Sequence, residues 1–395
     1  MRAFFLRVTD NFPYGVAFAA AFAAASVLLV ALSASPFAAI GAMAQGAFGS
    51  ENATAETLVK ATPILFVAVG ICIAFRGGVT NIGGEGQMIM GALASVTVAL
   101  AMPTAPGPIT VTLSLMAGLV AGGLYGGLAG LLKAYFSVNE ILSTIMLNQV
   151  AVQIMNFLLN GPLLDPTEIG TNAIAKTARI AESAELPRLS LPLPGGIADM
   201  FGTAELFGRT RLHWGLLLAV VLAVVTYVLL WRTTIGYRIR AVGQNERAAR
   251  YAGISIPRNV ILSMLLAGGF AGLGGAVQVL GLQYRLQTDG SPTGFTANAG
   301  FNGIVAALFG GLNPLGAIPA SAFFGGLLVG AQKMQRDLGI PASLITAING
   351  LIVMFVVSAQ YFVRRRLKRR AFAPSEPVEA PSALTHTPAP AEGNP

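Results

Sequence analysis

The sequence predicts an all-α integral membrane protein, and three observations support this fold class. Charged residues make up only 11% of the 395 residues, against roughly 25% in an average soluble domain. Hydrophobic residues make up 54%, and the mean hydropathy is +0.68. Charges are also missing from long continuous stretches such as 86–132 and 290–332. Because a soluble protein of this length needs charged side chains to cover its surface, the composition argues against a soluble globular enzyme.

The apolar stretches divide into about ten expected membrane-spanning helices, since one span needs about 20 apolar residues. Two of these stretches, 58–75 and 299–312, are short and lie beside polar, glycine-rich sequence, which is typical of broken helices. In chain order, the expected spans are 15–33, 58–75, 85–102, 109–132, 140–160, 212–231, 259–283, 299–312, 315–332 and 340–363.

The first expected span follows Arg2 and Arg7, so a signal peptide is an alternative interpretation. However, the apolar run of about 18 residues is longer than a usual signal-peptide core. The small-residue motif at 42–44 also lies far beyond its end. A retained anchor helix is therefore favoured, preceded by a cytoplasmic N-terminus at 1–14.

The distribution of Lys and Arg predicts that both ends of the chain are cytoplasmic. The segment 232–258 holds six Arg and one acidic residue, and six of the seven residues in 364–370 are basic. An even number of spans places both on the inside and leaves the loop 165–211, with six acids and five bases, outside. The net charge of +8 then reflects topology and attraction to anionic membrane lipid, so no nucleic-acid partner is expected. The tail 364–395 is basic at first and then rich in Pro and Ala, which predicts disorder.

The chain lacks the motifs of several enzyme classes. No G-x-x-x-x-G-K-[ST] motif occurs, so the chain is not expected to hydrolyse ATP itself. One Cys and two His leave little for a metal site, and no cofactor is expected. An intramembrane hydrolase would need an activated nucleophile or paired carboxylates, whereas Glu85 is the one carboxylate expected at membrane depth beside polar partners.

The stretch 75–87, FRGGVTNIGGEGQ, concentrates polar groups and glycines between two apolar runs. Irregular backbone at membrane depth persists only where it is buried in protein or lines water, and broken helices of this kind form binding sites in transporters. If the second helix starts near Asn81, then Asn81 and Glu85 lie one turn apart on one face. Alternatively, the stretch is an interfacial turn in which Asn81 is the N-cap and Glu85 lies in the first turn. The two alternatives are compatible, and Asn81, Glu85 and Gln87 are candidates for the substrate pathway.

A second polar feature is a stripe of amides in the expected span 140–160. Positions 149, 153, 156 and 160 follow an i, i+4, i+7, i+11 pattern, which places them on one helical face. Amides do not face lipid, so the stripe faces either a polar pathway, which is favoured, or neighbouring helices. Amides both donate and accept hydrogen bonds, which suits hydroxyl groups or a neutral base. The further pathway candidates are Asn148, Gln149, Gln153, Asn156, Asn302 and Asn349.

Glycines in the expected span 109–132 follow a different pattern. Gly118, Gly122, Gly126 and Gly130 form an i+4 series. Because small residues let helix backbones approach closely, this span is expected to pack tightly against a neighbouring helix.

The segment 245–253 is predicted to form a short helix between two spans. Asn245 is a favoured N-cap, Glu246 suits the first turn, and Gly253 is a C-terminal stop. A helix of this length is not stable alone, so it needs a partner surface. Small residues flanked by Arg offer little apolar area to lipid and suit a groove on another protein.

Four stretches of the chain carry a resemblance to a known family. With them, the chain resembles the inner-membrane permease subunits of ABC importers of the branched-chain amino acid/ribose type, and in particular the nucleoside or simple-sugar permeases. The resemblance extends from about residue 60 to residue 363 and implies a transmembrane permease domain over 15–363. The stretches are FRGGVTNIGGEGQMIMGALA (75–94), VNEILSTIMLNQVA (138–151), TTIGYRIRAVGQNERAARYAGI (233–254) and GFNGIVAALFGGLNPLGA (300–317).

Stretch 233–254 is similar to the coupling-helix region that ABC permeases insert into their ATPase. The sequence departs from the family's Glu-Ala-Ala signature, because Arg247 separates Glu246 from the two alanines. The departure affects the detailed contacts rather than the role. The resemblance implies that the ATPase is contacted by Asn245, Glu246, Arg247, Ala248, Ala249, Arg250 and Gly253.

The resemblance implies a permease subunit, not an enzyme, in the bacterial inner membrane. Its implied partners are an ABC ATPase subunit, a second and shorter permease, an extracytoplasmic substrate-binding protein and membrane lipid. The implied substrates are nucleosides or related sugars. The alternative is a secondary transporter or channel for a small polar solute, which explains the helix break and the amides but not the helix at 245–253.

Overall fold

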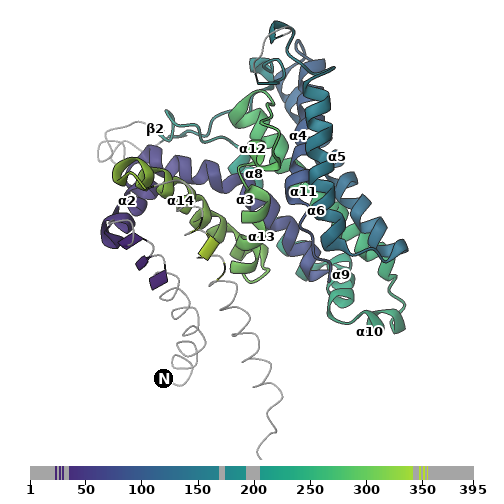
Figure 1. The fold of residues 1–395 in the computed structure, drawn as a ribbon. Coiled ribbons are helices and arrows are strands. Elements are labelled where there is room, and N and C mark those ends of the chain that lie inside the picture. The colour runs from purple at the N-terminus through teal and green to yellow at the C-terminus, as the bar shows by residue number, and fades with distance from the viewer. Residues whose placement is uncertain are drawn as a thin grey trace, which may run out of the picture.

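The computed structural model of the chain describes residues 35–168, 174–192 and 205–340, with scattered positions within 23–30 and 347–354. Helices dominate this part of the chain (Figure 1), and seven of them are long and apolar enough to cross a membrane. The strands β1 (Leu191–Pro192) and β2 (Glu205–Leu206) form a minor antiparallel pair. The prediction of an all-α integral membrane protein is confirmed.

The seven long helices coincide with seven of the expected spans to within a few residues, apart from extended ends of α3 and α14. They are α3 (Glu51–Arg76), α4 (Gly84–Ala101), α5 (Gly107–Phe136), α6 (Glu140–Leu159), α8 (Gly215–Arg232), α11 (Ile256–Gln278, continued by the π-turn η3, Val279–Gln283) and α14 (Pro314–Leu338). The shorter helices are α2 (Pro36–Phe48), η1 (Pro166–Glu168), η2 (Glu182–Ala184), α9 (Thr234–Gln244), α10 (Glu246–Tyr251), α12 (Pro292–Thr296) and α13 (Ala299–Phe309).

Expectation and structure differ in the number of complete spans. The expected span 299–312 is the 11-residue helix α13, which at 1.5 Å per residue is too short to cross the hydrocarbon core. The expected spans 15–33 and 340–363 lie almost entirely outside the described residues, as does the tail 364–395.

Helix α3 lies at the centre of the bundle. Every residue from 64 to 74 on it is buried, so this helix is apolar on all sides, as expected for a helix enclosed by others. Its N-terminus is capped by Ser50, whose Oγ accepts a hydrogen bond from the Ala53 amide at 3.1 Å. It packs against α8, α11, α13 and α14, and it thereby contacts helices from the later part of the chain.

The contact between α5 and α11 depends on glycine. A Cβ built on Gly122 would lie 2.5 Å from the Gly268 carbonyl oxygen, and a Cβ on Gly126 would lie 2.6 Å from the Met264 carbonyl oxygen. A Cβ on Gly272 would collide with the carbonyl of Gly118. These separations leave no room for side chains, which confirms the close packing predicted from the glycine series.

The outer helices present apolar side chains away from the bundle. Only 28% of the apolar window of α6 and of α8 is buried within the chain, against 78% for α3 and α11. These outward faces therefore meet lipid or another subunit. Large exposed apolar residues include Leu113, Val120 and Leu124 on α5, Met146, Val150 and Phe157 on α6, and Val221, Val225 and Val228 on α8.

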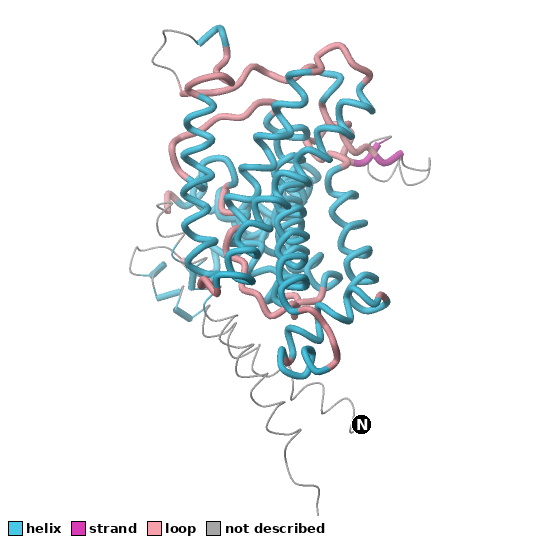
Figure 2. The backbone as a smooth tube through the Cα atoms, turned by 90° about the vertical axis from the view of Figure 1, so that its right-hand side faces the viewer, coloured by secondary structure: helices cyan, strands magenta, loops and turns pink. Residues whose placement is uncertain are grey.

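Two connections occupy opposite ends of the bundle. The α9–α10 pair projects at one end, and most of the connection from α6 to α8 lies at the other (Figures 1 and 2). An ion pair from Arg211 Nε to Glu56 Oε1 at 2.8 Å ties the described part of that longer connection to α3.

Candidate functional site

The predicted interruption between two apolar runs is present at the end of α3. The Gly77 amide donates to the Ile73 carbonyl at 2.9 Å, and the Val79 amide donates to the Ala74 carbonyl at 3.0 Å. Between them, Gly78 adopts φ of +78°, a left-handed conformation that favours glycine. The chain then runs back into the protein before α4 begins at Gly84.

Within this break, Asn81 and Gln87 form a reciprocal amide pair. Asn81 Nδ2 donates to Gln87 Oε1 at 3.0 Å, and Gln87 Nε2 donates to Asn81 Oδ1 at 3.1 Å. Asn81 Oδ1 also accepts from the Gly83 amide at 2.9 Å. The two side chains are only 1% and 2% exposed. Their hydrogen bonds therefore replace the water that an isolated amide would need.

The exact placement of Asn81 differs from both sequence-based alternatives. Helix α4 starts at Gly84, and its N-cap is Gly83, which makes no side-chain capping bond. Asn81 therefore lies before the helix, neither one turn from Glu85 on its face nor at its N-cap. The reason is its bond to the Gly83 amide, which forms an Asx-type turn instead of a cap.

Asn148 on α6 ties the break to a third helix. Its Oδ1 accepts from the Gly86 amide at 2.8 Å, and its Nδ2 donates to the Ile82 carbonyl at 3.0 Å. Thr144, one turn earlier, accepts from the Ile82 amide at 3.3 Å. A Cβ on Gly86 would lie 2.9 Å from Asn148 Oδ1, so glycine is needed for this approach. These bonds satisfy backbone groups that the helix break leaves without helical partners.

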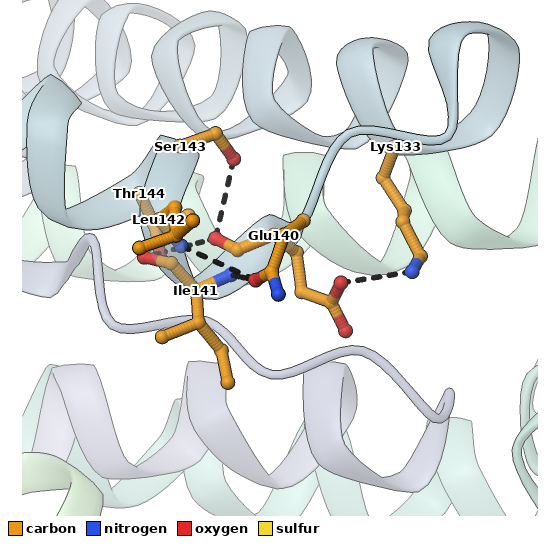
Figure 3. Close-up of polar contacts among 7 residues, drawn as sticks. Lys133, Glu140, Ile141, Leu142, Ser143 and Thr144 are labelled. Carbon is orange, nitrogen blue, oxygen red and sulfur yellow. Dashed lines mark hydrogen bonds and ion pairs between the residues drawn. The ribbon is translucent and has the colours of Figure 1, made fainter.

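The start of α6 is itself anchored to α5 (Figure 3). Asn139 is the N-cap, and its Oδ1 accepts from the Ile141 amide at 2.9 Å. Glu140 Oε2 forms an ion pair with Lys133 Nζ at 2.9 Å. The Thr144 hydroxyl donates to the Glu140 carbonyl at 2.6 Å. This end of α6 is therefore held in place close to the helix break.

Glu85 reaches from α4 to the N-terminus of α13. It is 1% exposed, and its Oε1 accepts from the Phe301 amide at 3.2 Å. Asn298, the N-cap residue of α13, makes no side-chain capping bond. A Cβ on Gly300 would lie 2.7 Å from the Glu85 carboxyl carbon. Glu85 thus supplies from another helix the acceptor that the first turn of α13 needs.

The amide stripe on α6 divides into inward and outward members. Asn156 is half-buried, and its Oδ1 accepts from the Thr288 hydroxyl at 2.7 Å. Asn160 is exposed at the C-terminus of the helix, where its Nδ2 donates to the Asn156 carbonyl at 2.8 Å. Gln149 and Gln153 are exposed. These two side chains make no hydrogen bond within the described part of the chain, so they remain open to a partner from outside it.

Asn302 and Asn349 are the two remaining pathway candidates. Asn302 is half-buried on α13, and Asn349 lies outside the described residues. The structure therefore brings together Asn81, Gln87, Asn148 and, against α13, Glu85.

The short helix predicted at 245–253 is present as α10. Asn245 is its N-cap, with Oδ1 accepting from the Ala248 amide at 3.1 Å. Gly253 ends the turn with φ of +73°. Sequence reasoning missed the preceding helix α9, because Gly236 interrupts a short polar stretch. In the folded chain, that glycine lets α9 pack directly on the backbone of Leu230, where a Cβ would lie 2.5 Å from Leu230 Cα.

The surface of α10 is largely free within this chain. Tyr251 is 96% exposed, whereas Ala249 is only 3% exposed and packs inward. A hollow of about 450 Å³ lies over this helix, lined by Glu246, Arg247, Arg250 and Tyr251. Ala248 and Gly253 are also exposed. With the exception of Ala249, the candidate coupling residues therefore face outward.

Comparison with known proteins identifies the family of this chain. Residues 53–357 match the family model described as "Branched-chain amino acid transport system / permease component". The chain belongs to this family of permease components. It is therefore a transport subunit and not an enzyme, and its helices make it a multi-pass protein of the bacterial inner membrane. A secondary transporter or channel is not favoured, because the family consists of transport-system permeases whose ATPase is a separate subunit.

Individual members of the family are similar to this chain over most of their length. The permease is 36% identical to the guanosine ABC transporter permease protein NupP of Bacillus subtilis, over 83% of this chain and 88% of the relative. It is 34% identical to the glucose ABC transporter permease protein TsgB13 of Haloferax volcanii, over 88% and 87%. It is 30% identical to the nucleoside ABC transporter permease protein NupB of Lactococcus lactis, over 78% and 80%. No solved structure matches the chain.

Proposed function

We propose that this permease forms part of the pathway by which an ATP-driven importer moves nucleosides or related sugars. The observation that carries the substrate class is the similarity to relatives named for guanosine, nucleosides and glucose. The chemistry of the site agrees with an uncharged, hydroxylated solute. The side chains gathered at the helix break are amides, and Oε1 of Glu85, the carboxyl group beside them, accepts from the Phe301 amide.

The outward amides of α6 support a pathway on the outer face of that helix. Gln149 and Gln153 are exposed beside apolar residues such as Met146 and Val150. Unpaired amides are costly in lipid, so this face is expected to meet water, a solute or another subunit. We assign it to the boundary with a second, shorter permease, where the amides can donate to and accept from hydroxyl groups.

The α9–α10 end is proposed to lie in the cytoplasm and to bind the ATPase. The segment 232–258 carries six Arg and one acidic residue, as expected for a cytoplasmic loop. The exposed residues of α10 surround a hollow, and so short a helix gains stability from a protein partner. The opposite end, which includes most of the described part of the loop 165–211, then faces the extracytoplasmic binding protein.

A transport assay with the reconstituted transporter tests this function. Uptake of radiolabelled guanosine and of glucose is measured with the binding protein, both permeases and the ATPase present. The variant Gln153→Leu is expected to lower uptake severalfold, while Phe157→Leu, a change one turn away on the same outward side of α6, leaves uptake intact. A binding protein that binds only branched-chain amino acids would refute the substrate class, and equal uptake in the two variants would refute the pathway on α6.

A further inference from the structure

The helix break also contacts α9, and no side chain lies between the two. A Cβ built on Gly243 would collide with the Arg76 carbonyl oxygen and lie 2.7 Å from the Gly78 amide nitrogen. A Cβ on Gly78 would in turn lie 2.9 Å from Gly243 Cα. The backbone of α9 therefore rests directly on the left-handed turn that ends α3.

Two arginines fix the position of this contact by sharing one aromatic ring. The guanidinium of Arg76, on α3, lies 5.4 Å from the centroid of Trp231, and its Nε donates to the Leu312 carbonyl at 3.1 Å. The guanidinium of Arg240, on α9, lies 5.8 Å from the same centroid. Its Nε donates to the Leu230 carbonyl at 2.9 Å. Because both cations depend on the same ring, α9 cannot slide along the end of α3 without disturbing these contacts.

On its inner side, the same break joins the buried amide cluster. The turn at Gly78 is followed within a few residues by Asn81, which is bonded to Gln87, and by Ile82, whose carbonyl is bonded to Asn148 on α6. A continuous series of close contacts therefore runs from α9, through the break, to the helix that carries the outward amides. Chains of packed groups and hydrogen bonds can carry coupling between distant sites.

We propose that Gly243 is the positioning residue through which movement of the α9–α10 pair reaches the helix break and α6. The inference rests on the proposed function, in which α10 binds the ATPase. A backbone-to-backbone contact transmits a shift directly, since it has no flexible side chain to absorb the movement. The Trp231 ring and its two arginines keep the contact in register. Arg76 extends the same movement to the turn between α13 and α14 through its bond to Leu312.

The variant Gly243→Ala tests this role in the complete transporter. The added methyl group is expected to separate α9 from the break while leaving the surface of α10 unchanged. The ATPase should therefore still co-purify with the permease, whereas the amount of solute transported per ATP hydrolysed should fall about fivefold or more, the size of a typical coupling between sites. A matched control is Gly127→Ala on α5, where the new Cβ makes only ordinary contact with Leu265 at 3.8 Å. This control should keep the wild-type ratio.

A second variant covers the outcome in which Gly243→Ala does not fold. Trp231→Leu adds no atoms at the contact but removes the ring that both arginines share, and it should lower the same ratio. A purely structural role would reduce the amount of folded protein and leave the ratio unchanged. A wild-type ratio in folded Gly243→Ala, or in Trp231→Leu where the first variant is unfolded, overturns the inference. Failure of the ATPase to co-purify with the wild-type permease overturns the proposed function instead.

Discussion

Replacing Glu85 distinguishes a carboxyl group that caps α13 from one that takes part in transport. The structure shows Oε1 accepting from the Phe301 amide at 3.2 Å in a position that is 1% exposed. The substitution Glu85→Leu keeps similar bulk but leaves that amide without its acceptor. An unsatisfied buried donor costs about 1–3 kcal/mol. For a chain of this length, this corresponds to a fall of roughly 1–4 °C in the melting temperature.

The matched change is Glu85→Gln, which keeps an acceptor oxygen at the same distance along the side chain. If capping is the role of Glu85, this variant loses less than about 1 kcal/mol and retains uptake. Melting is measured on purified permease in detergent, and uptake is measured in vesicles that hold the complete transporter. Loss of uptake in Glu85→Gln with an unchanged melting temperature would refute the capping role and would return Glu85 to the pathway as a reacting or substrate-binding group.

Two further predictions follow from the described contacts. Replacing Asn148 with Leu removes bonds to the Gly86 amide and the Ile82 carbonyl and should destabilise the permease by about 2–4 kcal/mol, measured as melting in detergent. Gln149→Leu on the exposed face of the same helix should change the stability by less than about 0.5 kcal/mol. Equal losses in the two variants would contradict a stabilising role of the Asn148 hydrogen bonds. Burial lowers the pKa of His213 from 6.5 to about 4, so the unfolded chain binds a proton that the folded chain does not. Stability should therefore fall as pH drops from about 6.5 to about 4, by at most about 1.4 kcal/mol per pH unit, and an unchanged slope in His213→Phe would show that another group is responsible.

The hydrophobic and charge patterns were sufficient to predict the long helices, because the formation of each long helix depends mainly on the composition of its own segment. The apolar runs of α3 and α11 are typical of enclosed helices, and the i+4 glycines of α5 indicate a close neighbour without naming it. The length of α13 could not be predicted in this way. Its apolar run resembles a span, but its N-terminus is set by a contact with Glu85, which lies far away in the sequence.

The polar residues show the same limit more clearly. The stretch 75–87 indicated a break between two helices, and Asn81, Glu85 and Gln87 lie in or beside that break. It could not indicate that Asn81 bonds Gln87 while Glu85 bonds α13, because each choice of partner depends on how α4, α6 and α13 meet. Likewise, the helical pattern placed Gln149 and Asn156 on one face. Only the packing of the neighbouring loop at Thr288 shows which of them is occupied.

The reciprocal pair of Asn81 and Gln87 suggests why a permease would keep amides in its core. Each net hydrogen bond in such a pair is worth about 0.5–1.5 kcal/mol, so opening both bonds costs about 1–3 kcal/mol. A solute with hydroxyl groups can replace both bonds, since a hydroxyl donates and accepts as an amide does. A charged solute would require ionic partners, whereas the two side chains of this pair are neutral amides. On the proposed function, exchange of amide–amide bonds for amide–hydroxyl bonds would let the site change shape at low cost and would favour neutral, hydroxylated substrates.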